Sequence, residues 1–114
     1  MIRQILFYGN YFKKFYDHQN EKTKEKIDFV LNLIANVEMV PEKFLKHLEG
    51  TEGLYEIRVK SGSNIFRVFC FFDGGRLVIL LNAFQKKSEK TPKKEIVLAE
   101  KMKKQYFLEK SKGE

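Results

Sequence analysis

Hydrophobic and polar residues follow the clearest pattern between residues 54 and 84. Leu54–Lys60 alternates with a period of two, which is typical of a strand with one buried face and one solvated face. Ile65–Phe72 and Leu77–Phe84 are almost continuously apolar, as expected for strands covered on most of both faces. Asp73–Gly75 lies between these two runs and supplies the glycines that a tight hairpin turn needs. The pattern therefore predicts three successive strands, with a first loop at Ser61–Asn64.

The residues before this segment predict one strand and two helices. Ile2–Tyr8 is short, apolar and β-prone, so we expect a first strand there. Asn10 precedes aromatic residues at helical spacing and is expected to cap a short helix. Asn20 opens a second amphipathic helix that runs to about Val37, and Pro41–Leu48 is expected to form a further short helical turn. The aromatic stripe comprises Tyr8, Tyr11, Phe12 and Phe15, and the apolar stripe of the second helix comprises Ile27, Val30, Leu31, Ile34 and Val37.

The residues after the strands predict a terminal helix. Thr91 is expected at its N-cap and Pro92 at its first position, and the helix runs to about Lys110. Its narrow apolar seam consists of Ile96, Ala99, Met102 and Tyr106. Helices gathered early and an antiparallel meander late predict an α+β fold, with two N-terminal helices packed on a small antiparallel sheet and a C-terminal helix. We expect residues 1–114 to form a single domain.

Composition limits the class of protein. With 43% hydrophobic residues and 11 phenylalanines the chain can fill a core, which excludes disorder for its body. No stretch approaches the ~20 apolar residues of a membrane span, and the N-terminus lacks an apolar signal core. The one cysteine, Cys70, lies inside an apolar strand and is expected to be a buried thiol. We therefore expect a cytoplasmic protein with no membrane partner.

The positive charge of the chain is unevenly placed. The net charge is +7, and residues 86–114 hold 10 lysines against 5 glutamates. This distribution suits a polyanion or an acidic protein partner. A solvated lysine-rich helix accounts for it equally well.

The candidate chemistry of the chain is cationic. Zinc, P-loop, dinucleotide and Ser-His-Asp patterns are all missing from the sequence. Arg67 is the one charge inside an apolar strand, so it needs either a partner or an anion site. Arg58 lies on the adjacent strand, and Lys86 and Lys87 follow the last strand, so the four cations are expected to converge around a phosphate. Glu56 shares a face with Arg58, and a simple ion pair between them is the alternative.

Several segments together resemble the RelE/HigB toxin superfamily. They are Leu54–Arg58, Ile65–Val68 with its Phe-rich continuation, Asp73–Gly74, Leu80–Lys87 and Lys90–Ile96. The likeness is to the phage-derived HigB-like branch and covers about residues 43–104. It is specific because the Lys-Lys-x-x-Lys-Thr-Pro run follows the arginine-bearing strands at the distance seen in that family.

The resemblance implies a RelE-like fold and the toxin of a type II toxin–antitoxin pair. Such toxins cut mRNA on the ribosome and thereby inhibit translation. The RNA's own 2′-hydroxyl attacks the adjacent phosphate, so the implied reaction uses no metal and no cofactor. The implied partners are a cognate antitoxin and mRNA on the ribosome.

The resemblance also implies roles for individual residues. Arg67 matches the strand arginine that acts on the scissile phosphate, and Arg58 matches a second basic position of the site. Lys86 and Lys87 match the basic end of the last strand, where the family has a general acid or a phosphate clamp. Glu56 stands where RelE has a basic residue, so it is either the general base or a partner of Arg58. Expected RNA-binding residues are Lys60, Phe84 (as a stacking face), Lys87, Lys90 and Lys94.

Two other functions remain open at this point. A ParE-like inhibitor of DNA gyrase shares the fold and would block supercoiling instead of cutting RNA. A non-enzymatic domain would bind nucleic acid or an acidic antitoxin with a steep dependence on salt. The set of Arg58, Arg67 and Lys86 favours RNA cleavage over both.

Overall fold

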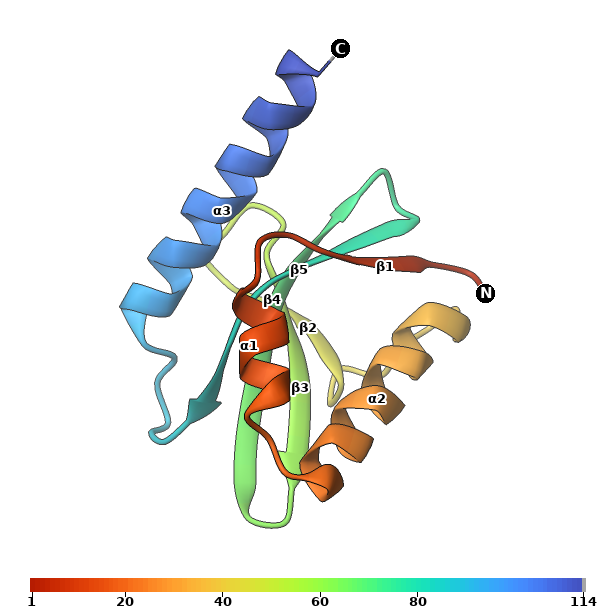
Figure 1. Ribbon diagram of the computed structural model, residues 1–114, viewed down its shortest axis with the longest axis vertical. Helices are drawn as coiled ribbons and strands as arrows, with labels where there is room; N and C mark the ends of the chain where they lie inside the picture. Colours follow the sequence, from red (N-terminus) through yellow and green to blue (C-terminus); the bar gives the residue numbers. More distant parts are fainter. Residues whose placement is uncertain (114) are drawn as a thin grey trace.

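A computed structural model describes residues 1–113, which form five strands and three helices (Figure 1). Most of their positions follow the hydrophobic pattern of the sequence. The elements are β1 (Gln4–Phe7), α1 (Tyr11–Asp17), α2 (Glu21–Asn36), β2 (Leu45–His47), β3 (Tyr55–Ser61), β4 (Asn64–Asp73), β5 (Leu77–Lys86) and α3 (Lys93–Lys112).

The five strands form one sheet in the order β1-β5-β4-β3-β2. The pairs β2–β3, β3–β4 and β4–β5 are antiparallel, and β1 is an edge strand that pairs in parallel with β5. Gly74 and Gly75 have φ angles of 73° and 83°, so the predicted hairpin turn uses them in the left-handed region that glycine tolerates. The three predicted strands and the α+β fold class are confirmed.

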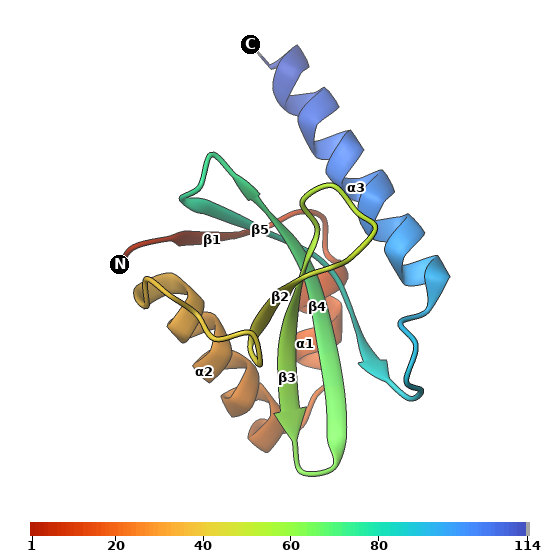
Figure 2. The ribbon, with the colours of Figure 1, turned by 180° about the vertical axis from the view of Figure 1, so that it is seen from behind.

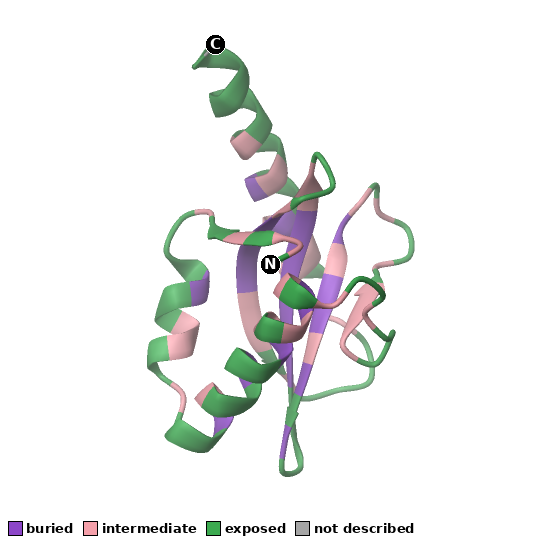
Figure 3. Cartoon of the chain, turned by 90° about the vertical axis from the view of Figure 1, so that its right-hand side faces the viewer, coloured by how far each residue is buried: buried purple, intermediate pink, exposed green. Residues whose placement is uncertain are grey.

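The two faces of the sheet are covered differently. α1 and α2 pack on one face, and α3 packs on the other (Figures 1 and 2). The tip of the β3–β4 hairpin extends away from α3 in both views. Buried residues are concentrated in the central strands, while the outer surfaces of the helices are exposed (Figure 3). The second face is therefore covered only over the half that packs against α3.

A β-bulge decides which residues of β5 reach that second face. Val68 pairs with Ala83 and Cys70 pairs with Leu80, so two residues of β5 oppose Phe69 alone. The extra residue reverses the alternation along β5. As a result Lys86, paired with Ile65, lies on the same face as the charged residues of β3 and β4.

Two predicted local structures need correction. The helical turn predicted for Pro41–Leu48 is present only in its first part, where the amides of Phe44 and Leu45 both donate to the carbonyl of Pro41, at 2.9 and 3.2 Å. Leu45–His47 forms β2 instead, because the edge of β3 offers hydrogen bonds that a three-residue strand can take. Thr91 is not the N-cap of α3. Pro92 occupies that position, and the hydroxyl of Thr91 donates to Glu56 Oε2 at 3.4 Å.

The predicted caps and stripes at the N-terminal helices are partly confirmed. Asn20 caps α2, and its side chain accepts a hydrogen bond from the amide of Thr23 at 2.8 Å. Asn10 stands at the N-cap of α1, but its side chain makes no capping hydrogen bond. In the aromatic stripe Phe12 is buried, whereas Tyr11 is 47% exposed. The stripe is therefore narrower than its spacing predicts.

Cys70 is buried in β4, as expected from the sequence. Burial raises the pKa of its thiol, because the thiolate would lose its hydration. Within residues 1–113, no helix is long and apolar enough to cross a membrane.

The C-terminal half of α3 is fixed to the sheet by a charged hydrogen-bond cluster. The hydroxyl of Tyr106 donates to Asp73 Oδ2 at 2.6 Å, and the ammonium of Lys110 donates to the same oxygen at 2.9 Å. The hydrogen bond from Tyr106, followed by that from Lys110, lowers the pKa of Asp73. The same contact, with burial, raises the pKa of Tyr106 to about 12.

We expect Tyr106→Phe to lower the free energy of unfolding by about 1.5–3 kcal/mol at pH 7, the range for a hydrogen bond to a charged group. The pKa of Asp73 is lower in the folded protein than its ordinary value of 3.8, so its carboxylate stabilises the fold at pH values above 3.8. This stabilisation is lost as the pH falls below 3.8 and through the lower pKa of the folded state. Urea unfolding at several pH values measures both effects. Tyr11→Phe, at an exposed tyrosine, is the control, and equal stability of the two variants at pH 7 would contradict the prediction.

Candidate functional site

The half of the sheet face that α3 leaves uncovered carries two arginines and one glutamate. Arg58 on β3 lies directly opposite Arg67 on β4, and Glu56 lies two residues before Arg58. Residues two apart in a strand share a face, so all three side chains point to the same side. The convergence of Arg58 and Arg67 predicted from the sequence is present in the structure.

Glu56 lies between the two guanidinium groups. Its Oε1 is 3.7 Å from Arg58 Nε and its Oε2 is 3.7 Å from Arg67 Nε. Glu56 is only 4% exposed and Arg67 is 9% exposed, whereas Arg58 is half-buried. The partner that a buried Arg67 requires is therefore Glu56, and the predicted pair of Glu56 with Arg58 forms as well.

One carboxylate does not fully satisfy these two cations. At 3.7 Å the contacts are ion pairs but too long for hydrogen bonds, and the Nε atoms of both arginines have no hydrogen-bond partner within residues 1–113. Arg67 Nη1 donates to the carbonyl of Phe66 at 3.1 Å. Burial lowers the pKa of Arg67, Glu56 opposes this shift, and the neighbouring Arg58 adds to it. The site thus has a net positive charge and capacity for an anion.

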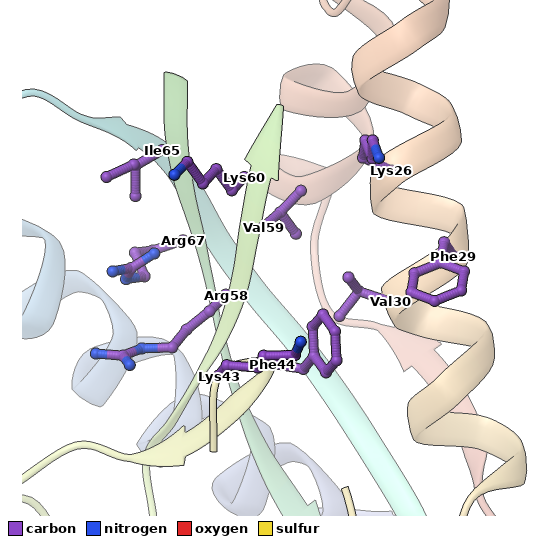
Figure 4. A pocket seen from close by; sticks show the side chains of 10 residues that line it. All are labelled: Lys26, Phe29, Val30, Lys43, Phe44, Arg58, Val59, Lys60, Ile65 and Arg67. Atoms are coloured by element: carbon purple, nitrogen blue, oxygen red, sulfur yellow. The ribbon is translucent and has the colours of Figure 1, made fainter. Parts of the chain in front are cut away.

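Two hollows meet at Arg67 and Ile65. The first, of about 470 Å³, wraps around the edge of β3 towards α2 (Figure 4). Its lining comprises Lys26, Phe29, Val30, Lys43, Phe44, Arg58, Val59, Lys60, Ile65 and Arg67. The second, of about 480 Å³, is an open depression at the end of β5, and its lining comprises Ile65, Arg67, Lys86, Lys87, Ser88 and Glu89. The two hollows adjoin at Arg67, and together they are called the basic path.

Of the other residues predicted for the site, some line a hollow and others do not. Lys60 lines the first hollow, and Lys86 and Lys87 line the second. Glu56 lines neither hollow, because its oxygens face the arginines and Thr91. Phe84 also lines neither, since its ring packs edge-on against Phe69 at 5.3 Å.

Lys90 and Lys94 are exposed but lie outside both hollows. Lys90 is in the loop before α3, and Lys94 is in the first turn of that helix. The predicted role of Lys90 and Lys94 in binding RNA therefore stays a prediction.

Sequence reasoning missed several residues of the site. Thr91 contacts Glu56 although the pattern assigned it to a helix cap. Lys26 and Phe29 on α2, with Lys43 and Phe44 before β2, line the first hollow. One signal was available for Phe29, which is a large apolar residue outside the buried stripe of its helix.

Within residues 1–113, no group of three or more His, Cys, Asp or Glu residues is arranged to hold a metal ion. The arginine and lysine side chains that line the two hollows can bind an anion and stabilise negative charge, and lysine can also transfer a proton.

The fold is similar to that of chains in two solved toxin–antitoxin complexes. The first is the RelB–RelE antitoxin–toxin complex from Methanococcus jannaschii, with a TM-score of 0.53, 18% identity, and coverage of 76% of this chain and 99% of that chain. The second is the archaeal RelE–RelB complex from Pyrococcus horikoshii OT3, with a TM-score of 0.54, 18% identity, and coverage of 73% and 93%. These likenesses confirm the RelE-like fold.

No curated protein matches the sequence. A family model does match it, over residues 14–104, and carries the description "Phage derived protein Gp49-like (DUF891)". The matched range includes α2, the whole β2–β5 part of the sheet and the first half of α3. The chain therefore belongs to the family of Gp49-like phage-derived proteins.

Proposed function

We propose that this protein is the toxin of a type II toxin–antitoxin pair, of the HigB-like branch, and that it cleaves mRNA on the ribosome. Residues 1–114 act as one toxin domain in the cytoplasm, where translation takes place. Support comes from the fold shared with chains of RelB–RelE complexes and from the phage-derived family.

The observation that carries the proposal is the arginine pair on the open face. Two adjacent guanidinium groups share one carboxylate, and both line the basic path. Like charges at short range disfavour each other unless an anion is present, and a phosphodiester supplies that anion. The planar forks of arginine match phosphate oxygens better than a point charge does.

The proposed reaction is attack by the RNA's 2′-hydroxyl on the adjacent phosphate. Negative charge grows on the phosphate oxygens in the transition state, and Arg67 and Arg58 stabilise it. Water in the open second hollow accepts the proton of the attacking 2′-hydroxyl, and Lys86 in that hollow donates the proton that the leaving 5′-oxygen needs. Glu56 holds the two guanidinium groups in place and does not touch the RNA, since it lines neither hollow.

The cationic path also suits a protein partner. Glu56 is shared between two arginines, and the lining of the first hollow has five cationic side chains and no carboxylate. A cognate antitoxin segment with carboxylates placed over the arginine pair supplies counter-charges and blocks the site.

Cleavage of a defined mRNA, naked and bound to a programmed ribosome, tests the function. We expect the wild-type protein to cut the ribosome-bound mRNA and to leave naked RNA intact. Primer extension locates the cut, and a cyclic 2′,3′-phosphate end identifies 2′-hydroxyl attack. If the folded protein cuts neither RNA but blocks DNA supercoiling by gyrase, the ParE-like function replaces this proposal. A protein that only binds RNA would be a non-enzymatic domain.

A further inference from the structure

The first hollow continues well beyond the arginine pair and ends at α2. Figure 4 shows Arg58 and Arg67 at one end of the hollow and Phe29 and Lys26, both on α2, at the other. Five cationic side chains line it, and its lining includes no carboxylate. A hollow of about 470 Å³ lies within the ordinary size of small-ligand sites. The proposed cleavage reaction at the arginine pair leaves this extension without a role.

Phe29 is the unusual side chain in this hollow. It is 56% exposed on α2, next to a buried stripe that already anchors the helix to the sheet. Its ring meets that of Phe44 at a centroid distance of 6.1 Å and an angle of 72°. The ammonium of Lys43 lies 5.0 Å from the centre of the Phe44 ring. Phe29 is thus a supported but open aromatic surface in a hollow whose lining includes three lysines.

The short length of β2 opens the hollow at the edge of the sheet. β2 pairs with β3 only as far as Ile57, and the last hydrogen bond runs from the amide of Arg58 to the carbonyl of Phe44 at 2.8 Å. Beyond this point the β3 edge faces the hollow. Because both hollows have Ile65 and Arg67 in their linings, a flexible chain bound in the second hollow at Arg67 is also at the start of the first.

We propose that the part of the first hollow between β3 and α2 is a nucleotide subsite for single-stranded RNA. The base of a nucleotide flanking the scissile phosphate stacks on Phe29, and Lys26, Lys43 and Lys60 bind the neighbouring phosphates. Proteins that bind single strands combine a basic groove with aromatic faces, because every base has a π-face and every nucleotide has a charge. The inference rests on the proposed function, since the subsite extends from the arginine pair that performs the cleavage.

Binding of a short uncleavable RNA tests the subsite separately from cleavage. The probe is a fluorescein-labelled adenosine pentanucleotide with 2′-O-methyl groups, which cannot be cut by 2′-hydroxyl attack, and the readout is fluorescence anisotropy. We expect Phe29→Ala to weaken binding about tenfold, the loss that removal of one base-stacking ring produces. Phe7→Ala is the control, since Phe7 is 54% exposed and lies outside the hollow. Lys43→Gln should reduce the slope of log affinity against log salt by about 0.7, the value for one single-strand phosphate contact.

Three outcomes overturn the subsite. Phe29→Ala binds the pentanucleotide as tightly as wild type, or it loses no more affinity than Phe7→Ala does. Alternatively, a poly-glutamate peptide binds more tightly than the RNA and depends on Phe29, which would assign the hollow to an acidic protein segment.

Failure of the subsite and failure of the proposed function give different results. A protein that cleaves ribosome-bound mRNA but binds the pentanucleotide independently of Phe29 retains the nuclease function and loses the subsite. A protein that cleaves no RNA but binds the pentanucleotide through Phe29 retains the subsite as an RNA-binding surface and loses the nuclease function. Circular dichroism of each variant shows that it is folded.

Discussion

Replacing Arg67 with alanine lowers the cleavage of ribosome-bound mRNA by about 100- to 1,000-fold, the effect of removing one donor that stabilises transition-state charge. Arg67 lines both hollows and lies opposite Arg58 at the centre of the basic path. Arg67 is only 9% exposed, so its charge acts on a bound phosphate with little screening by water. The measurement is single-turnover cleavage on a programmed ribosome.

Two further variants make this result interpretable. Arg67→Lys keeps a positive charge beside Glu56 and thus the fold, yet we expect a large loss of cleavage because an ammonium lacks the planar fork. Arg76→Ala removes an exposed arginine at the β4–β5 turn and should cleave like wild type. Folded Arg67 variants with unchanged cleavage would place the reaction elsewhere.

The sequence predicts the centre of the fold because local chemistry determines it. The period of two in Leu54–Lys60, the two apolar runs and the glycine turn each predict a strand or hairpin independently of the rest of the chain. Asn20 likewise marks the start of α2 because its side chain caps a helix amide within three residues. The convergence of Arg58 and Arg67 follows from the same hairpin register.

The features that the sequence does not reveal depend on distant contacts. β2 has only three residues and takes its conformation from hydrogen bonds to β3, so it has no periodicity of its own. The bulge opposite Phe69 is hidden because β5 is apolar on both faces, which masks the reversal of its alternation. The position of Lys86 beside the site therefore follows from the structure and not from counting residues.

Burial of Glu56 is a similar case. Its place in the alternating strand assigns it to the solvated face, together with Arg58 and Lys60. In the structure the segment before α3 brings Thr91 against it, and Arg67 approaches from the next strand. Tertiary contacts thus change a predicted surface glutamate into the buried centre of the site.

Replacing Glu56 with glutamine lowers the free energy of unfolding by about 2–3 kcal/mol. This loss is smaller than that for a fully buried ion pair that loses one partner, because Arg58 is partly exposed to water. The amide keeps the size of the side chain but removes the negative charge. Arg58 and Arg67, which face each other across the β3–β4 pair, then repel each other without compensation. Urea unfolding at low and high salt measures the loss, and salt should reduce it by screening the repulsion.

Glu100→Gln, at an exposed glutamate on α3, is the matched control and should change stability by less than about 0.5 kcal/mol. Because Glu56 lines neither hollow, its loss should act on cleavage through the positions of the two guanidinium groups. We therefore expect Glu56→Gln to lower the cleavage rate more than the affinity for RNA, since removing a negative charge also favours RNA binding. If Glu56→Gln is as stable as wild type and cleaves at the normal rate, the arginine pair needs no carboxylate. Another interaction would then have to explain why Arg67 is tolerated in an apolar strand.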